Sequence, residues 1–188
     1  LDPGLISEYM SLFRSNYFNI GADETFDLGK GVTKEIADKS GVERLYIDFV
    51  NKICEFVVSK GKIPMFWGDV ICGFPEYIKE LPKETICLNW GYAPDQSEES
   101  TQKLAQAGAV QYVCPGVGGW NQFMNLYDSC YQNISKMCMY GQKYHAIGML
   151  NTDWGDFGHV NHPSLSIPGL IYGAAFSWNL NILPMEEI

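Results

Sequence analysis

Basic residues are scarce in this 188-residue sequence, which has 13 Lys and Arg against 22 Asp and Glu. The formal net charge is −9 at pH 7 with histidine neutral. Because polyphosphate binding needs clustered Lys and Arg, this balance argues against nucleic acid or an anionic membrane as a partner. A neutral or cationic ligand fits the charge better.

Several common motifs are absent as well. The six cysteines include no CxxC pair, which removes the common zinc and redox patterns, so we predict no metal site and no cofactor. No GxGxxG or GxxxxGK motif is present to bind a nucleotide phosphate. No apolar run approaches the roughly 18 residues that suggest a membrane span.

The cysteines and the two chain ends bear on the setting of the protein. Several cysteines lie inside apolar runs, where they behave as small hydrophobes, and this favours reduced thiols and a cytoplasmic compartment over disulfides. The chain starts with LDPGLISEYM, without an initiator methionine, and closes on ILPMEEI. We therefore expect both ends to be cut from something longer. A signal peptide would precede Leu1, so the localisation stays open.

Composition and periodicity predict a globular α/β domain. Hydrophobic residues make up 46% of the chain and charged residues 19%, which is typical of a domain with a core. Short apolar runs alternate with longer amphipathic segments, as expected when helices cross over between parallel strands. The predicted strands are residues 17–22, 62–68, 85–91, 109–116 and 146–154. The predicted helices are residues 41–61, 97–108, 121–142 and 166–181.

Two folds fit about five βα units. A closed (β/α)8 barrel takes about 250 residues, so these units would form a little over half of one. An open doubly wound sheet is the alternative, but its phosphate-binding version needs a glycine-rich turn after the first strand. The first predicted strand ends in acids instead, which favours the partial barrel.

The carboxyl ends of the predicted strands share a chemistry of acids and tryptophans. The residues concerned, in strand order, are Asp23 and Glu24, Trp67 and Asp69, Trp90 and Tyr92, Trp120 and Asn121, and Asp153, Trp154 and Asp156. In β/α barrels this edge of the sheet carries the active site. Indoles stack on sugar rings and carboxylates accept hydroxyl protons, so the pattern predicts a sugar pocket. The alternative is that the tryptophans are core residues, since tryptophan is highly buried on average.

The segment FNIGADE resembles the acid-pair motif of glycoside hydrolase family 20, the β-N-acetylhexosaminidases, in which a strand ending in Gly-x-Asp-Glu supplies both catalytic carboxyls. LDPG resembles the segment that often precedes this strand, and FWGD, NWG and DWGD fall where the family places tryptophans. The resemblance runs from Leu1 to about Trp178. It implies that residues 1–188 are one domain, the second half of a (β/α)8 TIM-barrel catalytic domain.

The resemblance also implies a substrate-assisted mechanism, in which the substrate's 2-acetamido oxygen attacks the anomeric carbon with net retention. Glu24 would protonate the leaving oxygen and then activate water. Asp23 would hold the acetamido N–H and stabilise the positive charge that develops on the nitrogen. The two neighbours can serve one sugar if the strand ends at Gly21 to Ala22 and the backbone turns. Two acids at a strand end are otherwise typical of a solvated loop or a helix N-terminus.

The tryptophans would bind the sugar. By the same resemblance, Trp154 would stack on the terminal ring and Asp156 would bind its far hydroxyls, although the family usually has glutamate there. Trp67 and Trp90 would help to wall the acetamido pocket.

The fourth predicted strand departs from the family pattern. The family commonly has Tyr-x-Asp there, whereas this chain has PGVGGWNQF, in which Trp120 and Asn121 would substitute. His159 and Asn161 are loop residues near the predicted pocket, and His159 is a candidate ligand. Asp69 would either orient a neighbour, touch substrate or make a structural hydrogen bond.

Two residues of the predicted helices have simpler interpretations. Trp178 is predicted to pack within the last helix. Asn133 begins NIS, a glycosylation sequon, but it lies in a predicted helix.

Three functions stay open at this point. The first is an exo-acting, retaining β-N-acetylhexosaminidase that releases terminal β-linked GlcNAc or GalNAc from an amino-sugar glycan. The second is another acetamido-sugar hydrolase of similar architecture. The third is an inactive or carbohydrate-binding barrel fragment, because the family's sugar-binding arginine comes from an early strand that this sequence lacks. A half barrel exposes two sheet edges, which predicts pairing with its missing half or with a second copy of the chain.

Overall fold

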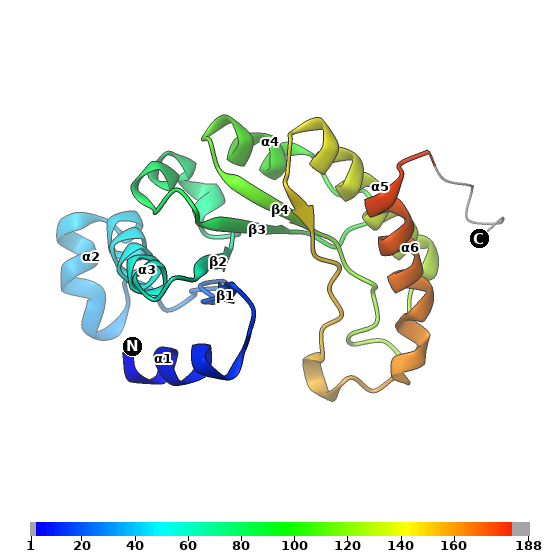
Figure 1. Cartoon of the computed structure of the whole chain (residues 1–188), viewed down its shortest axis with the longest axis horizontal. Coiled ribbons are helices and arrows are strands. Elements are labelled where there is room, and N and C mark those ends of the chain that lie inside the picture. Colours follow the sequence, from blue (N-terminus) through cyan, green and yellow to red (C-terminus); the bar gives the residue numbers. More distant parts are fainter. Residues whose placement is uncertain (1–2, 182–188) are drawn as a thin grey trace. The chain divides into compact units, whose positions relative to one another are not determined.

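The computed structural model describes residues 3–181, so LD at the start and ILPMEEI at the end of the chain lie outside the described residues. The strands of this part are β1 (Tyr17–Asn19), β2 (Ile63–Trp67), β3 (Ile86–Trp90), β4 (Val110–Cys114) and β5 (Gly148–Met149). The α-helices are α1 (Pro3–Leu12), α2 (Lys34–Ser40), α3 (Val42–Ser59), α4 (Glu99–Gln106), α5 (Tyr127–Lys143) and α6 (Ile167–Trp178) (Figure 1). None of these helices is long and apolar enough to cross a membrane.

The strands join in one sheet in the order β1-β2-β3-β4-β5. β1 pairs with β2 in parallel, with Tyr17 opposite Ile63, and β4 pairs with β5 in parallel. An isolated parallel bridge between Gly116 and Thr152 extends the second pairing beyond the strands. The predicted alternation of strands and helices is therefore confirmed, and the chain is an α/β protein.

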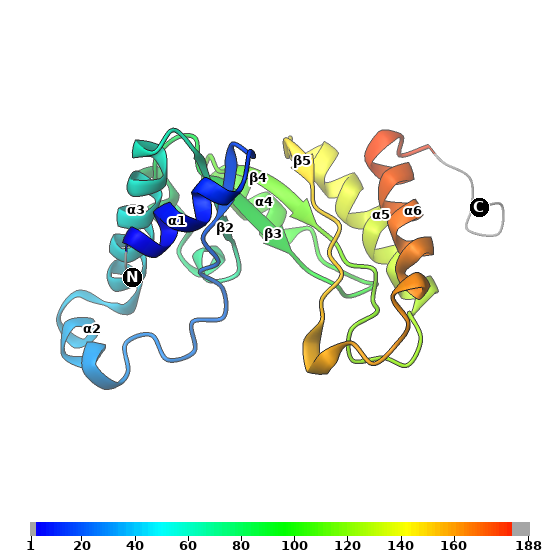
Figure 2. The ribbon, with the colours of Figure 1, turned by 60° about the horizontal axis from the view of Figure 1, so that its bottom comes forward.

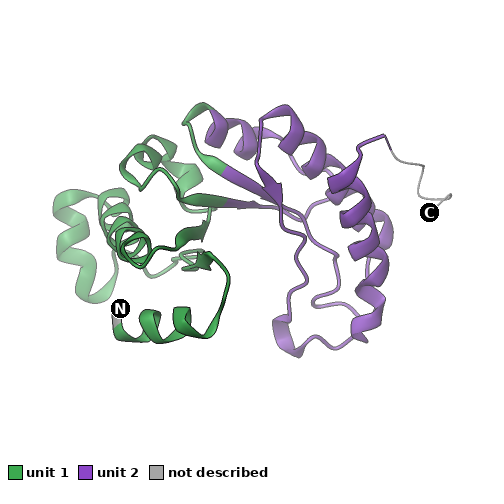
Figure 3. Ribbon diagram, in the orientation of Figure 1, with its two compact units in different colours: residues 1–87, 106–110 green, residues 88–105, 111–188 purple. Residues whose placement is uncertain are grey.

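The chain divides into two compact units (Figure 3). Unit 1 comprises residues 1–87 and 106–110, and unit 2 comprises residues 88–105 and 111–188. The division passes through β3 and β4, so each unit contains part of the sheet.

Unit 1 has its core between helices α1 and α3 and strand β1. Ile6 and Met10 of α1 meet Ile53 and Val57 of α3 in one buried cluster. Full burial of an aliphatic side chain of this size stabilises a fold by about 1.5–3 kcal/mol. Helix α3 stops where predicted, because Gly61 has a φ of +74° and its N–H donates to the Val58 carbonyl, which closes the last turn.

Unit 2 has its core between helices α5 and α6, which run side by side in both views (Figures 1 and 2). The buried residues of this cluster are Val117, Cys130, Ile134, Cys138, Tyr172 and Phe176. The close approach of α6 to the loop after β4 depends on Gly169, because a Cβ there would lie 2.8 Å from Cβ of Val117. Larger side chains at this position would force the helix away from the loop that follows β4.

One predicted helix begins later than expected, and other details of the helices differ from the prediction. The predicted helix over residues 121–142 begins only at Tyr127, because Asn121 has a left-handed φ of +61° and the Asn125 side chain is buried in a loop. Helices α1 and α2 were not predicted. The predicted packing of Trp178 is wrong, since that side chain is 92% exposed.

The six cysteines are free thiols, and all but Cys72 are buried. Burial raises the pKa of the Cys138 thiol to about 11 and that of the Cys130 thiol to about 12. A thiol must lose its proton to act as a nucleophile or metal ligand, so these residues serve as small core hydrophobes.

Candidate active site

The acid pair follows β1 on a backbone that leaves the extended conformation. The pairing with β2 continues past the strand, as the Ile20 N–H donates to the Met65 carbonyl at 2.8 Å and the Trp67 N–H to the Gly21 carbonyl at 2.9 Å. The φ angles are then positive at Gly21 (+76°), Ala22 (+73°) and Glu24 (+48°). Asp23 and Glu24 therefore lie on a turn, as their adjacency requires, and the strand ends at Asn19, earlier than predicted.

This turn is strained, because non-glycine residues rarely adopt positive φ. Sparsely populated backbone conformations cost about 1–3 kcal/mol each and concentrate at functional sites. Ala22 and Glu24 are two such residues within three positions. Asp23 is half-buried and Glu24 is exposed.

Two side chains from other elements of unit 1 hold the turn. The Tyr46 hydroxyl of α3 donates to the Ala22 carbonyl at 2.9 Å. The Glu24 N–H donates to Oδ2 of Asp69, just after β2, also at 2.9 Å. Burial, with the nearby carboxylates of Asp69 and Asp23, raises the pKa of Tyr46 well above its usual value, so Tyr46 stays a neutral donor. Of the roles predicted for Asp69, the structure shows a hydrogen bond to the main chain, and the other two stay predictions.

Trp67, the other predicted site residue of unit 1, is the last residue of β2 and is only 8% exposed. Trp67 is therefore a buried residue of the core. Its predicted part in an acetamido pocket stays a prediction.

Unit 2 brings three of the predicted tryptophans together around Tyr92. Trp90 stacks on Tyr92 with ring centroids 5.2 Å apart, and Trp120 meets it edge-on at 4.8 Å. Nε1 of Trp154 donates to the Tyr92 hydroxyl at 2.8 Å. We call these four residues the aromatic cluster. All four are half-buried, so part of each ring is accessible to a ligand.

Two residues fix the backbone under the aromatic cluster. A Cβ at Gly116 would lie 2.5 Å from Cη2 of Trp120, so only glycine leaves room for the indole. The buried Asn133 side chain donates to the carbonyls of Gly91 and Ala93, on either side of Tyr92, and accepts from the Gly116 N–H. Asn133 is fully buried, which shows that its sequon match is a coincidence of sequence.

The loop after β5 carries the remaining predicted site residues. Nε2 of His159 lies 3.3 Å from Oδ1 of Asp153, and this partner raises the pKa of His159. The chain turns here at Phe157 and His159, both with φ near +50°. Asn161 is buried and donates to the Gly119 carbonyl and to Asn125 Oδ1, so its role is structural.

The ion pair gives a testable pH dependence. We expect His159 to titrate above about 6.5, the ordinary value for histidine, because Asp153 stabilises the charged imidazole. A raised pKa in the folded state means that the pair stabilises the fold below pH 6.5, and that this contribution disappears as the pH rises through the folded value. NMR titration of the imidazole should show a lower midpoint in Asp153→Asn. The signal is identified by its loss in His159→Gln, and an unchanged midpoint in Asp153→Asn would refute the pairing.

The structure leaves two predicted residues outside these contacts. Asn121 and Asp156 are both exposed, the first beside Trp120 and the second in the 3-10 turn Asp156–Gly158. Sequence reasoning missed Tyr92 as the centre of the aromatic cluster and Asp153 as the partner of His159. The available signal was their place in NWGY and NTDWGD, directly beside the tryptophans.

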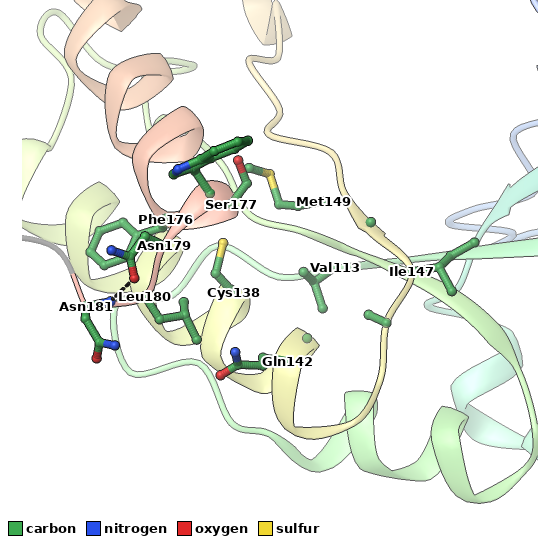
Figure 4. Close-up of a pocket in the computed structure, with 14 residues that line it drawn as sticks. Val113, Cys138, Gln142, Ile147, Met149, Phe176, Ser177, Asn179, Leu180 and Asn181 are labelled. Atoms are coloured by element: carbon green, nitrogen blue, oxygen red, sulfur yellow. Dashed lines mark hydrogen bonds between the residues drawn. The ribbon is translucent and has the colours of Figure 1, made fainter.

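A cavity of about 410 Å³ lies elsewhere in unit 2, between α5, β5 and the end of α6 (Figure 4). Its lining includes Cys138, Gln142 and Phe176, and the Asn181 N–H donates to Asn179 Oδ1 beside it. No carboxylate or imidazole of the described residues lines it, so it lacks groups for acid–base chemistry. Within residues 3–181, no group of three His, Cys, Asp or Glu side chains is placed to hold a metal ion.

Comparison with known proteins gives one family and one fold. The family model "Glycosyl hydrolase family 20, catalytic domain" matches residues 3–161. No curated protein sequence is a significant match. The crystal structure of β-N-acetylhexosaminidase from Bacteroides fragilis is similar with a TM-score of 0.72 at 18% identity, over 98% of this chain and 40% of that one.

Two further structures agree. An inactive mutant of the exo-β-N-acetylglucosaminidase of Vibrio harveyi matches with a TM-score of 0.63 at 18% identity, over 94% of this chain and 30% of that one. The chitobiase of Flavobacterium johnsoniae matches with a TM-score of 0.56 at 18% identity, over 95% of this chain and 31% of that one. The chain thus spans less than half the length of these proteins. Its five strands form part of a TIM-type (β/α)8 barrel, as the sequence predicted.

Proposed function

Because the chain belongs to glycosyl hydrolase family 20, we propose that the protein is an exo-acting, retaining β-N-acetylhexosaminidase that releases terminal β-linked GlcNAc or GalNAc. The observation that carries the proposal is the acid pair on its left-handed turn after β1. A strained backbone that presents two adjacent carboxyls is typical of a functional site. Such a turn adds nothing to the packing of a hydrophobic core. The matched structures carry names of the same activity.

We assign the proton transfers to Glu24. In the first step its carboxyl gives a proton to the glycosidic oxygen as the bond to the anomeric carbon breaks. In the second step its carboxylate takes a proton from the water that attacks the same carbon. Its exposed position at the turn leaves the side chain accessible to both oxygens.

We assign the acetamido group to Asp23. The substrate's own carbonyl oxygen is the nucleophile in this mechanism, which forms an oxazolinium ring and needs no second enzymic nucleophile. The Asp23 carboxylate accepts the acetamido N–H and faces the positive charge that develops on the nitrogen. Adjacent acids thus act on two different atoms of one sugar.

Sugar binding is assigned to the tryptophans and their polar neighbours. Trp154 stacks on the terminal sugar and Asp156 and His159 bind hydroxyls, while Trp67, Trp90, Trp120 and Asn121 complete the recognition of the ring and its acetamido group. The aromatic cluster supports this assignment, because partly exposed rings fixed by their neighbours offer an apolar face at little entropic cost. A neutral amino sugar also suits a chain with a net charge of −9.

The proposal predicts a strong requirement for the 2-acetamido group. An aryl 2-acetamido-2-deoxy-β-glucoside should be hydrolysed at least about 10³-fold faster, as kcat/KM, than the aryl β-glucoside with the same leaving group, because an intramolecular nucleophile is held in place. NMR should show the β-anomer as the first product. Equal rates on the two glycosides would overturn substrate assistance. Saturable binding of N-acetylglucosamine without turnover would instead support a carbohydrate-binding module, which the aromatic cluster alone would explain.

A further inference from the structure

The turn that carries Asp23 and Glu24 is hydrogen-bonded at both ends to residues at or just after the end of β2. At its start, the Gly21 carbonyl accepts the N–H of Trp67, the last residue of β2. At its end, the Glu24 N–H donates to the carboxylate of Asp69, two residues later in the chain. Of the two strained residues, Ala22 lies between these bonds and Glu24 makes the second of them. The first bond extends the sheet, whereas the second depends on a particular side chain.

We propose that Asp69 is a positioning residue that fixes the acid Glu24 through its backbone. The inference rests on the proposed role of Glu24 as the general acid. A carboxylate that accepts an N–H makes a shorter and stronger hydrogen bond than a neutral acceptor, which suits it to hold a residue in an uncommon conformation. Its bond is to the main chain, so the carboxyl of Glu24 stays available to the substrate.

Tyr46 supplies a third point of attachment from α3. Its hydroxyl donates to the Ala22 carbonyl at 2.9 Å, within the strained part of the turn. Tyr46 is 2% exposed, so its position is fixed by the core of unit 1. Bonds at Gly21, Ala22 and Glu24 define the path of the turn, and the bond at Glu24 is the one nearest to the reacting atoms.

Loss of the Asp69 bond lets φ of Glu24 relax to a common value, which turns its side chain away from the glycosidic oxygen. A displacement of about 1 Å in a catalytic group costs on the order of 10²-fold in rate. The effect falls on kcat for substrates with poor leaving groups, since these depend on protonation. KM is little changed, because the sugar-binding residues stay in place.

Three substitutions separate position from charge. Asp69→Asn keeps an acceptor oxygen in place and loses the charge, Asp69→Glu keeps the charge and moves the acceptor by one methylene, and Asp69→Leu has a similar shape with neither. We expect Asp69→Asn to keep kcat within about 5-fold of wild type, Asp69→Glu to lose about 10-fold and Asp69→Leu about 10²-fold. KM should stay within about 3-fold throughout, and circular dichroism should show folded proteins.

The order of the variants decides the outcome. If Asp69→Glu is more active than Asp69→Asn, the charge of Asp69 acts directly and the positioning role is wrong. If Asp69→Leu is folded and as active as wild type, Asp69 has no part in the reaction. If Asp69→Leu does not fold, the comparison of Asp69→Asn with Asp69→Glu still decides between position and charge. Glu24→Gln is made in parallel, because full activity in that variant would overturn the proposed function itself rather than the role of Asp69.

Discussion

Glu24→Gln is expected to lower kcat by about 10²–10⁴-fold on N-acetyl-β-glycosides with poor leaving groups, because an amide is far too weak an acid to protonate the departing oxygen. Glutamine has nearly the same shape, and the hydrogen bond from the Glu24 N–H to Asp69 belongs to the main chain, so the turn should persist. Substrates with activated aryl leaving groups need less protonation and should lose less in the first step.

The leaving-group series makes this prediction specific. Rates of wild type and Glu24→Gln should be measured over aryl N-acetyl-β-glucosaminides whose phenols span a range of acidity. Asp27→Asn is a matched control, since Asp27 is an exposed acid three residues further along the same loop. Small losses of equal size across the series would show that Glu24 is not the acid.

The second large effect is expected at Asp23. Asp23→Asn keeps the size of the side chain but removes the negative charge opposite the developing oxazolinium. Removing one preorganised group of this kind costs about 10²–10³-fold in kcat. The loss should be the same for good and poor leaving groups, because Asp23 acts on the nucleophile. This pattern differs from that of Glu24→Gln and distinguishes two adjacent carboxyls by kinetics alone.

The sequence predicted the central strands closely. The bounds 62–68, 85–91 and 109–116 differ from β2, β3 and β4 by one or two residues at each end. These strands are flanked on both sides in the sheet, so their apolar runs are largely buried and the sequence signal is strong. The outer strands are shorter than predicted. β1 ends at Asn19 because the backbone enters the left-handed turn at Gly21, and β5 keeps only Gly148 and Met149.

The helices show where periodicity is insufficient. Helix α1 was not predicted, and its start contains Pro and Gly, although proline is well tolerated in the first turn of a helix. Ile6 and Met10, four residues apart and both buried, were the available signal. In α3, Phe49 lies one helical turn before the buried Ile53 and has the spacing of an apolar stripe, but it is 48% exposed, since the buried face is rotated towards Tyr46 and Val50.

The candidate site, like the fold, was predictable only in part. The order of acids and tryptophans along the chain was enough to select Asp23, Glu24 and the tryptophans as candidates. The contacts among them were not predictable, because they join residues far apart in sequence. The hydrogen bond between Trp154 and Tyr92 spans 62 positions and that between Glu24 and Asp69 spans 45. Such pairs depend on register and rotamers, which periodicity does not encode.

The most direct test of the account is binding of an N-acetylglucosamine thiazoline, which mimics the oxazolinium intermediate, measured by calorimetry on wild type and on Asp23→Asn. Analogues of a reacting state bind at least about 10²-fold more tightly than the corresponding ground-state ligand. Substrate assistance with Asp23 on the acetamido group predicts this advantage over N-acetylglucosamine in the wild-type protein and its loss in Asp23→Asn. Binding of the thiazoline no tighter than that of N-acetylglucosamine, or equally tight in both proteins, would contradict it.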